Sequence, residues 1–368
     1  MMKKLAIDRD DLEKSLIALL NTPSPSGYCD PIVHLVGEAL QADGIEFHVT
    51  RRGAIRATLP GAQKTPDRAV AVHLDTIGAM VAGLKPNGRL ALAPVGTWSS
   101  RFAEGARVTV FGAGGPLRGT VLPLKASGHI FADAVNAQPT DWAHVEIRLD
   151  VRCLNDGDLN RAGIAVGDFV AFDATPEISG GFVNARHLDD KAGVATLLAV
   201  AHAVATQDVA LPVDAHLLFT ISEEVGSGAA HVLYADVAEM VIIDHAPVGP
   251  GQHSSEYGVT IGMMDMTGPF DYHLSQKLIG LCQAAALPYC RDIFKFYRTD
   301  SASAIEAGND IRTALIGFGL DASHGYERTH MDSLMALADL IGLYLQSPPT
   351  FTRDKDDLAP LNGFPRQP

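Results

Sequence analysis

The stretch LLFTISEEVGSG, residues 217–228, joins an apolar run to two adjacent carboxylates and a Gly-Ser-Gly turn. A short apolar run that ends in turn residues is typical of a buried strand. Glu223 and Glu224 follow that strand directly, and two like charges repel each other unless a positive charge lies nearby. The stretch therefore predicts a buried strand with a charged site at its carboxyl end.

Predicted strands and helices alternate on both sides of this stretch. Before it come helices at 8–20, 31–42 and 191–207, and strands at 47–52, 54–59 and 69–75. After it come helices at 226–236, 271–285 and 331–346, and strands at 239–245 and 312–319. This alternation predicts an α/β fold with a doubly wound, mostly parallel sheet.

Residues 80–166 break the alternation. Short β-branched runs such as RVTVFG and HVEIRLDV are separated by Gly, Pro and Asp turns, which is typical of a small barrel. We therefore expect residues 1–80 and 166–350 to form one discontinuous catalytic domain. We also expect an inserted β-barrel at 81–165, which would serve oligomerisation, and an extended, Pro- and charge-rich tail at 351–368.

The bulk properties of the chain exclude several classes of protein. The 368 residues carry a formal net charge of −14, so neither nucleic acid nor an anionic membrane is expected as a partner. The N-terminus MMKKLAIDRDDLEK has no apolar run after its lysines, and the apolar stretch at 192–205 is too short for a transmembrane helix. The four cysteines form no CxxC pair. We expect a soluble, cytoplasmic protein with reduced thiols.

Residues that commonly bind metals stand at the predicted strand ends, where sites form in open α/β sheets. In chain order they are His73-Leu74-Asp75, His187-Leu188-Asp189-Asp190-Lys191, Glu223-Glu224, Asp244-His245, and the loop DASHGYERTHMD with His324 and His330. Each segment alone is explained more simply by a helix cap or a loop histidine. Together they would gather repelling carboxylates in one crevice, and two divalent cations would relieve that repulsion.

Such a pair of cations makes definite chemical demands. A bridging carboxylate must join the two ions, and each ion needs further oxygen or nitrogen ligands. Mixed imidazole and carboxylate ligands suit Zn²⁺, Co²⁺ or Mn²⁺ better than Ca²⁺. A separate carboxylate must then accept a proton from the attacking water and pass it to the leaving group.

These segments resemble the tetrahedral aminopeptidases, the glutamyl and deblocking aminopeptidase family of dinuclear metallopeptidases. The resemblance covers nearly the whole chain and rests on the segments NTPSPSGYCDPI, VHLDTIGAMV, VGDFVAFD, HLDDKAG, ISEEVGSGAA, VIIDHAP, YRTDSASAI and ERTHMDSL. The long HGYERTHMDSL loop and the tail are similar to a subgroup associated with osmoprotectant gene clusters, those of N-acetylglutaminylglutamine amide.

The resemblance implies a role for each ligand-type residue. One metal would be bound by His73, Asp189 and Asp244, and a second by Glu224 and His330, with Asp189 bridging the two. Glu223 would be the general base. The resemblance also implies that Asp75 orients the His73 imidazole and that Asp190 lies outside the ligand set at the start of a helix.

The chain departs from the family pattern near the expected substrate pocket. Thr76 stands where the family has an acidic residue, and Tyr297-Arg298 stand where it has small glycines. The final loop reads Thr329-His330-Met331 instead of Ile-His-Ser. His324 competes with His330 for the last ligand position, and we prefer His330 because a helix start follows it as in the family.

The implied function is a metal-dependent aminopeptidase that removes N-terminal residues from short peptides. Zn²⁺ would be the preferred cofactor, with Co²⁺ or Mn²⁺ as substitutes, and the enzyme would be a homo-oligomer built from dimers, with a dodecamer as the family's large form. A second possible function is that of an amidase or deacylase that acts on an N-acetylated dipeptide amide at the same centre. A glycosidase that uses Glu223 and a partner carboxylate is a third, and a non-catalytic binding protein is a fourth.

Overall fold

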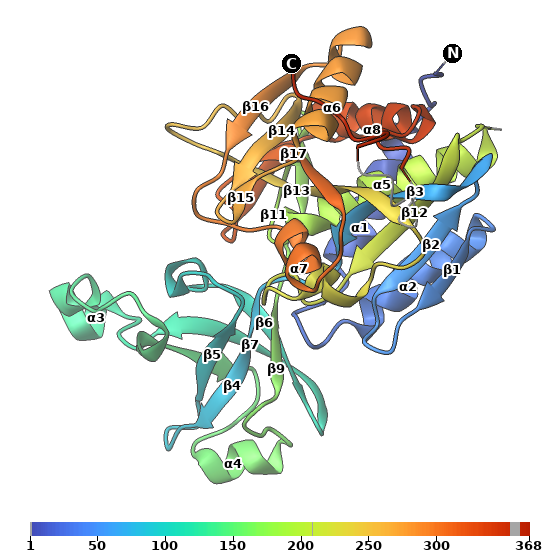
Figure 1. Cartoon of the computed structure of the whole chain (residues 1–368). Helices are drawn as coiled ribbons and strands as arrows, with labels where there is room; N and C mark the ends of the chain where they lie inside the picture. Colours follow the sequence, from blue (N-terminus) through green and yellow to red (C-terminus); the bar gives the residue numbers. More distant parts are fainter. Residues whose placement is uncertain (1, 208, 354–360) are drawn as a thin grey trace.

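The computed structural model describes residues 2–207, 209–353 and 361–368, and within them the chain forms a large mixed sheet and a separate β-barrel (Figure 1). Residues 354–360 of the predicted tail lie outside the described residues. No helix in the described part of the chain is long and apolar enough to cross a membrane.

The large sheet has a parallel centre and antiparallel flanks. Its main path runs β1 (Glu46–Val49), β2 (Ile55–Leu59), β12 (Val213–Thr220), β3 (Gln63–His73), β13 (Val237–Val248), β17 (Arg312–Asp321), β18 (Glu327–His330), β11 (Phe182–Ala185) and β10 (Glu177–Ser179). A branch leaves β17 through β14 (Val259–Asp265), which also pairs with β15 (Gly268–Pro269) and β16 (Tyr289–Ile293). The predicted α/β class is confirmed, and on the main path the parallel pairing is confined to β12, β3, β13 and β17.

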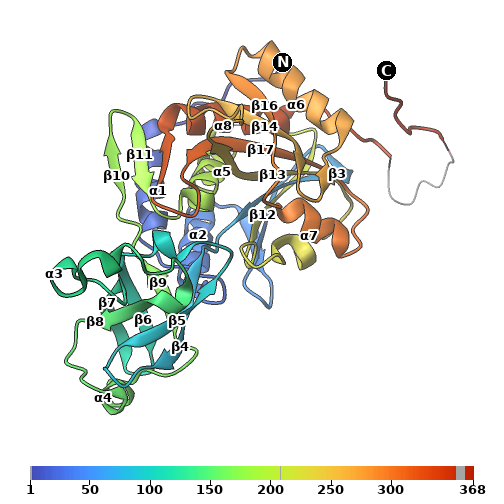
Figure 2. The ribbon, with the colours of Figure 1, turned by 90° about the vertical axis from the view of Figure 1, so that its left-hand side faces the viewer.

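The parallel strands are buried because helices cover them. The helix α5 (Leu188–Thr206) packs against β3, β13 and β17, and α6 (Tyr272–Ala284) and α8 (Met331–Gln346) pack against β17. Two further helices, α1 (Arg9–Leu20) and α2 (Asp30–Ala42), pack against α5. The Ala- and Val-rich α5 is buried over most of its length, because it packs against β3 and β13 of the sheet and against the helices α1 and α8 (Figures 1 and 2). The short α7 (Asp300–Glu306) packs against η4 (Gly228–His231), a 3₁₀ helix of about one turn.

The predicted helix at 226–236 is therefore wrong, because the described residues of that segment contain only η4. Two buried contacts account for the short turn. The Asp300 carboxylate accepts the Ala229 amide at 2.8 Å, and a side chain at Gly228 would collide with the same carboxylate. A tertiary contact from α7 thus fixes the backbone of a segment whose sequence alone suits a helix.

The barrel is closed by six antiparallel strands in the order β4 (Gly78–Leu84), β5 (Leu90–Val95), β8 (Val145–Leu149), β7 (Gly115–Pro123), β6 (Arg107–Gly112) and β9 (Phe169–Phe172). The short helices α3 (Gly128–Phe131) and α4 (Asp156–Arg161) lie in its connections. Valines such as Val108, Val121 and Val170 fill a core that is separate from that of the large sheet. The barrel strands run from residue 78 to 172, so the barrel extends a few residues beyond the predicted 81–165 at both ends.

A buried ion pair joins β3 to β13 and α8. The Arg68 guanidinium lies 3.5 Å from the Glu239 carboxylate, and it also donates to the Tyr344 carbonyl and lies over the Tyr344 ring. Glu239 accepts a further hydrogen bond from the Tyr344 hydroxyl at 3.0 Å. Because Arg68 and Glu239 are almost fully buried, each charge depends on the other for compensation.

We expect Arg68→Met to lower the free energy of unfolding by about 3–5 kcal/mol, because it leaves the Glu239 carboxylate buried without its cation. Urea denaturation followed by circular dichroism measures this loss. Lys14→Ala, which breaks an ion pair with Asp11 on an exposed surface of α1, is the matched control and should change the transition little. An equal effect of the two substitutions would contradict the role of Arg68.

Candidate metal centre

The parallel strands bring the candidate ligands to one edge of the sheet. His73 is the last residue of β3, Glu223 and Glu224 follow β12, and Asp244 lies in the carboxyl-terminal half of β13. Asp189 belongs to the non-helical start of α5. Because β12, β3 and β13 are neighbours in parallel register, their carboxyl ends place these side chains together.

Among the described residues, two groups of three side chains could each hold a metal ion. His73, Asp189 and Asp244 form the first, and Asp189, Glu224 and His324 form the second, with the offered ligand atoms of each group all within 4.8 Å of one another. Asp189 is common to both groups. Its Oδ1 lies 3.0 Å from Nε2 of His73, and its Oδ2 lies 3.4 Å from Nε2 of His324.

The two imidazoles are oriented in the same manner, by backbone carbonyls. Nδ1 of His73 lies 2.9 Å from the Asp75 carbonyl, and Nδ1 of His324 lies 2.9 Å from the Thr97 carbonyl. A carbonyl can only accept, so Nδ1 carries the proton in both rings. In the neutral form of each ring Nε2 then keeps its lone pair, and this is the form that binds a metal.

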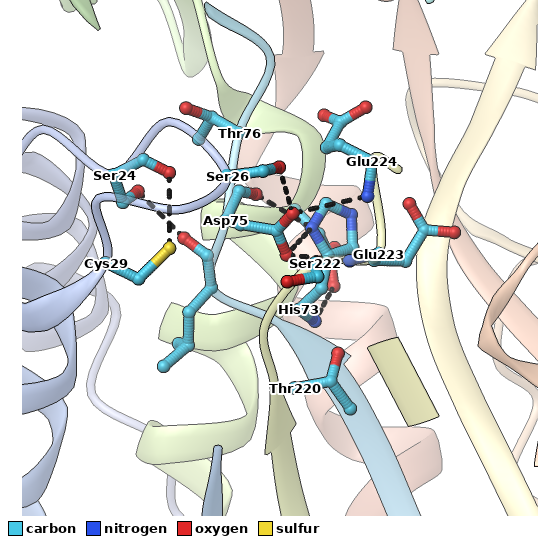
Figure 3. A network of polar contacts seen from close by, with 12 residues as sticks. Ser24, Ser26, Cys29, His73, Asp75, Thr76, Thr220, Ser222, Glu223 and Glu224 are labelled. Carbon is cyan, nitrogen blue, oxygen red and sulfur yellow. Dashed lines mark hydrogen bonds and ion pairs between the residues drawn. The ribbon is translucent and has the colours of Figure 1, made fainter. Parts of the chain in front are cut away.

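The Asp75 carboxylate does not orient His73 as the sequence predicted. Its nearest contact with the imidazole is 3.8 Å, and it is the Asp75 backbone carbonyl that bonds the ring. The carboxylate instead accepts the amides of Glu223 at 3.0 Å and Glu224 at 3.3 Å, together with the Ser26 hydroxyl (Figure 3). The Asp75 carboxylate therefore fixes the position of the backbone at Glu223 and Glu224.

The two glutamate side chains diverge, as expected of successive residues at a strand end (Figure 3). Glu224 accepts the Ile77 amide through Oε1 and lies 3.3 Å from Nε2 of His324 through Oε2. Glu223 belongs to neither ligand group and lines the adjoining cavity. Burial raises the pKa of the Glu223 carboxyl well above its usual range, and the negative charges of Asp244, Asp300 and Glu224 raise it further.

His330 does not occupy the position that the sequence predicted. It stands at the N-cap of α8, where its Nδ1 accepts the Asp332 amide at 3.1 Å, and its ring packs edge-on against Phe182. His324, the competing residue, is the imidazole that reaches Asp189 and Glu224. The helix start that follows His330, on which the preference for His330 rested, thus reflects its place as a helix cap. In the second group His324 stands where His330 was expected.

Glu327 is a residue of the site that the sequence did not reveal. Its buried carboxylate accepts the Asp189 amide at 3.2 Å and the His324 amide at 2.8 Å. Burial, followed by the charge of Asp189, raises the pKa of Glu327 to about 8. This side chain joins two of the three segments of the second group, those of Asp189 and His324. Its place in the HGYERTHMDSL loop was the only signal in the sequence.

Asp190 lies outside both groups, turned toward the first turn of α5. Its Oδ2 lies 3.4 Å from the His73 amide, and its carboxylate covers Gly193, where an added side chain would collide with it. Burial raises the pKa of Asp190 well above its usual range.

A cavity of about 1590 Å³ opens beside the two groups. Its wall includes Gly96, Thr97, Trp98 and Phe102 of the barrel domain, together with Tyr297 and Arg298. Thr76 lies elsewhere, on a smaller cavity of about 350 Å³, so that departure from the family does not face the large cavity. The Arg298 guanidinium is bonded to Glu306.

The donor set fits a pair of divalent cations. Each group offers one imidazole and two carboxylates, which is the mixed oxygen and nitrogen set preferred by Zn²⁺, Co²⁺ or Mn²⁺. Burial also raises the pKa of the Glu224 carboxyl, so the cluster is electrostatically costly with its protein charges alone. The carboxyl edge of the parallel sheet thus holds a candidate site for two divalent cations, next to the inserted barrel.

A model of the M42 glutamyl aminopeptidase family matches residues 53–340, and the chain belongs to this family. The putative aminopeptidase YhfE of Bacillus subtilis is 38% identical over 90% of this chain and 96% of its own length. The TET aminopeptidase of a marine sediment Thaumarchaeota archaeon has the same fold, with a TM-score of 0.82, 18% identity and coverage of 92% and 96% of the two chains. The TET1 peptidase of Pyrococcus horikoshii gives a TM-score of 0.80 at 20% identity, over 92% and 100% of the two chains.

Substitution of the two rival histidines tests the second group. We expect His324→Ala to lose one bound divalent cation per chain, because it removes an imidazole that faces Asp189 and Glu224. His330→Ala should retain both cations, since His330 faces Phe182 and caps α8. Metal analysis after dialysis against a buffered metal solution measures the difference, and the reverse pattern would restore His330 as the ligand.

Proposed function

We propose that the protein is a metal-dependent aminopeptidase that uses two divalent cations. The observation that carries this proposal is the pair of ligand groups joined by Asp189, with the Glu223 carboxylate next to them at the cavity wall. His73 and Asp244 would hold one ion, Glu224 and His324 the other, and Asp189 both. Zn²⁺ is the preferred occupant, and Co²⁺ or Mn²⁺ also suit these donors.

The chemistry follows from the placement of Glu223. Two such cations, when bound, lower the pKa of a water and polarise the substrate carbonyl. Glu223 would accept the proton of the attacking water and return it to the leaving amine, as a general base and then a general acid. Asp75 contributes by fixing the Glu223 and Glu224 amides, with Glu224 in a ligand group and Glu223 placed where it would face the attacking water.

The substrate class is short peptides with a free N-terminus. Membership of the M42 glutamyl aminopeptidase family and the similarity to YhfE support the removal of N-terminal residues. The cavity of about 1590 Å³ has room for several residues of an extended peptide. Apolar rings such as Trp98, Phe294 and Phe296 line its wall beside charged groups.

We also propose that the enzyme is a homo-oligomer and that the barrel contributes to its assembly. The similar Pyrococcus horikoshii TET1 peptidase can assemble into a tetrahedron or a large octahedral shell. Ile130, with 76% of its surface exposed, and Leu154, with 65%, lie in the barrel's connections, where a second copy could cover them. In this proposal the homo-oligomer would be built from dimers, with a dodecamer as one of its forms.

Glu223→Gln tests the assignment of the base. We expect it to keep both metals and the assembly but to lower kcat by about 10²–10⁴-fold, because the amide cannot accept the proton of the water. Steady-state kinetics on aminoacyl p-nitroanilides, with parallel metal analysis, give both readings. Asp190→Asn is the control, because it changes a neighbouring buried carboxylate that lies outside the ligand groups. We expect it to lower kcat much less than Glu223→Gln does. A Glu223→Gln enzyme with near-normal kcat would contradict the role of Glu223.

Metal removal, followed by assays on three kinds of substrate, distinguishes an aminopeptidase from a deacylase and from a glycosidase. We expect chelation to abolish turnover and one of Zn²⁺, Co²⁺ or Mn²⁺ to restore it on peptides with a free N-terminus. N-acetylated dipeptide amides, assayed in parallel, would be cleaved only if the centre serves a deacylase. Hydrolysis of glycosides that survives chelation would instead support a glycosidase.

A further inference from the structure

His245 is a buried imidazole at the metal centre whose position the ligand assignment leaves unexplained. It follows Asp244 at the carboxyl end of β13, and its ring lines the large cavity. Its Nδ1 lies 2.9 Å from Oδ2 of Asp189 and 3.0 Å from Oδ1 of Asp244. The imidazole therefore contacts the carboxylate common to both ligand groups and one carboxylate of the first group.

The direction of these hydrogen bonds follows from the partners. Ionised carboxylates only accept, so Nδ1 of His245 carries the proton and donates toward both oxygens. A carboxylate oxygen has two lone pairs, so Oδ2 of Asp189, which accepts one N–H of His245, keeps one for a cation. The His245 amide also donates to Oδ1 of Asp244 at 2.6 Å, which fixes that carboxylate from two directions. Oδ1 of Asp244 thus accepts two N–H groups of His245, so Asp244 would bind its cation through Oδ2.

Tyr297 holds the imidazole in place. The two rings are stacked, with centroids 4.8 Å apart and an angle of 27° between their planes. The Tyr297 hydroxyl donates to the His245 carbonyl at 2.9 Å, and the Tyr297 ring in turn packs at 5.1 Å from the buried ring of Phe294. Tyr297 thus holds His245 through both its ring and its hydroxyl, and we call this pair of contacts the clamp.

This arrangement differs from a substrate contact. Tyr297 is tied to a backbone carbonyl of β13 through its polar atom, and Nδ1 of His245 is engaged by two carboxylates. Partners of this kind fix the orientation of metal ligands and raise metal affinity, and their loss typically costs about 10–100-fold in affinity. Because Asp189 is common to both groups, a donor on its Oδ2 would influence the binding of both metals.

We propose that His245, clamped by Tyr297, is a positioning residue that orients the Asp189 and Asp244 carboxylates for the metal pair. The inference rests on the proposed function, because it presumes that those carboxylates bind metals. The inference states that tight metal binding requires an N–H donor at the Nδ1 position of residue 245, in addition to the ligands themselves.

Two substitutions at residue 245 isolate that N–H. The side-chain amide of His245→Asn can place an N–H where Nδ1 lies, whereas the longer side chain of His245→Gln places it near the Nε2 position. We expect His245→Gln to bind Co²⁺ about 10–100-fold more weakly in competition with a chromophoric chelator and to change the Co²⁺ absorption spectrum. His245→Asn should bind within a few-fold of the unsubstituted protein and keep the spectrum.

A third substitution tests the clamp from a distance. Tyr297→Ala removes the stacked ring and the hydroxyl without touching a carboxylate, and we expect it to weaken Co²⁺ binding in the same direction as His245→Gln. Tyr297→Phe keeps the ring and should lose less. Circular dichroism and gel filtration of each variant establish that the fold and assembly are retained.

The outcomes separate this inference from the proposed function. Equal Co²⁺ affinity and identical spectra for the Asn, Gln and unsubstituted proteins would overturn the positioning role while leaving the metal centre intact. Equal losses in the Asn and Gln variants would also overturn it, since the ring itself would then be a ligand. A failure of the unsubstituted protein to bind Co²⁺ would instead contradict the proposed function.

Discussion

The Asp189 carboxylate is the group on which the candidate centre depends. One oxygen faces His73 and the other lies near His245 and His324, so two three-residue groups meet at a single side chain. Burial alone would raise the pKa of Asp189, yet the imidazoles around it, foremost His245, hold that pKa well below its usual range. The carboxylate is thus kept ionised in a buried setting, which is the state that a bridging ligand requires.

Buried carboxylates outside the two ligand groups hold this cluster together. Asp75 joins the segment after β3 to the Glu223-Glu224 segment after β12, and Glu327 joins the start of α5 to the loop that carries His324. Both act on backbone amides, which fix position more firmly than contacts between flexible side chains. The relative positions of the expected ligands therefore depend on Asp75 and Glu327, two carboxylates that are not themselves expected to bind metal.

The barrel and the large sheet meet at the site. The Thr97 carbonyl of the barrel domain sets the His324 tautomer, and barrel residues line part of the large cavity. The barrel thus has a part in the geometry of the centre besides its proposed part in assembly. Tyr297, which the sequence placed among residues of the substrate pocket, lines the cavity, and its hydroxyl and its ring both contact His245.

The sequence by itself determined the α/β class, an inserted barrel and a set of ligand-type residues at the strand ends, of which the structure brings His73, Asp189, Glu224 and Asp244 together. These follow from local patterns, because apolar periodicity defines strands and parallel strands share a carboxyl edge. The choice between His324 and His330, the backbone role of Asp75 and the contribution of Glu327 were decided only by the tertiary structure. Each depends on a partner distant in the chain, as Nδ1 of His324 depends on the carbonyl of Thr97, and spacing along a sequence carries no information about which carbonyl a distant loop will present.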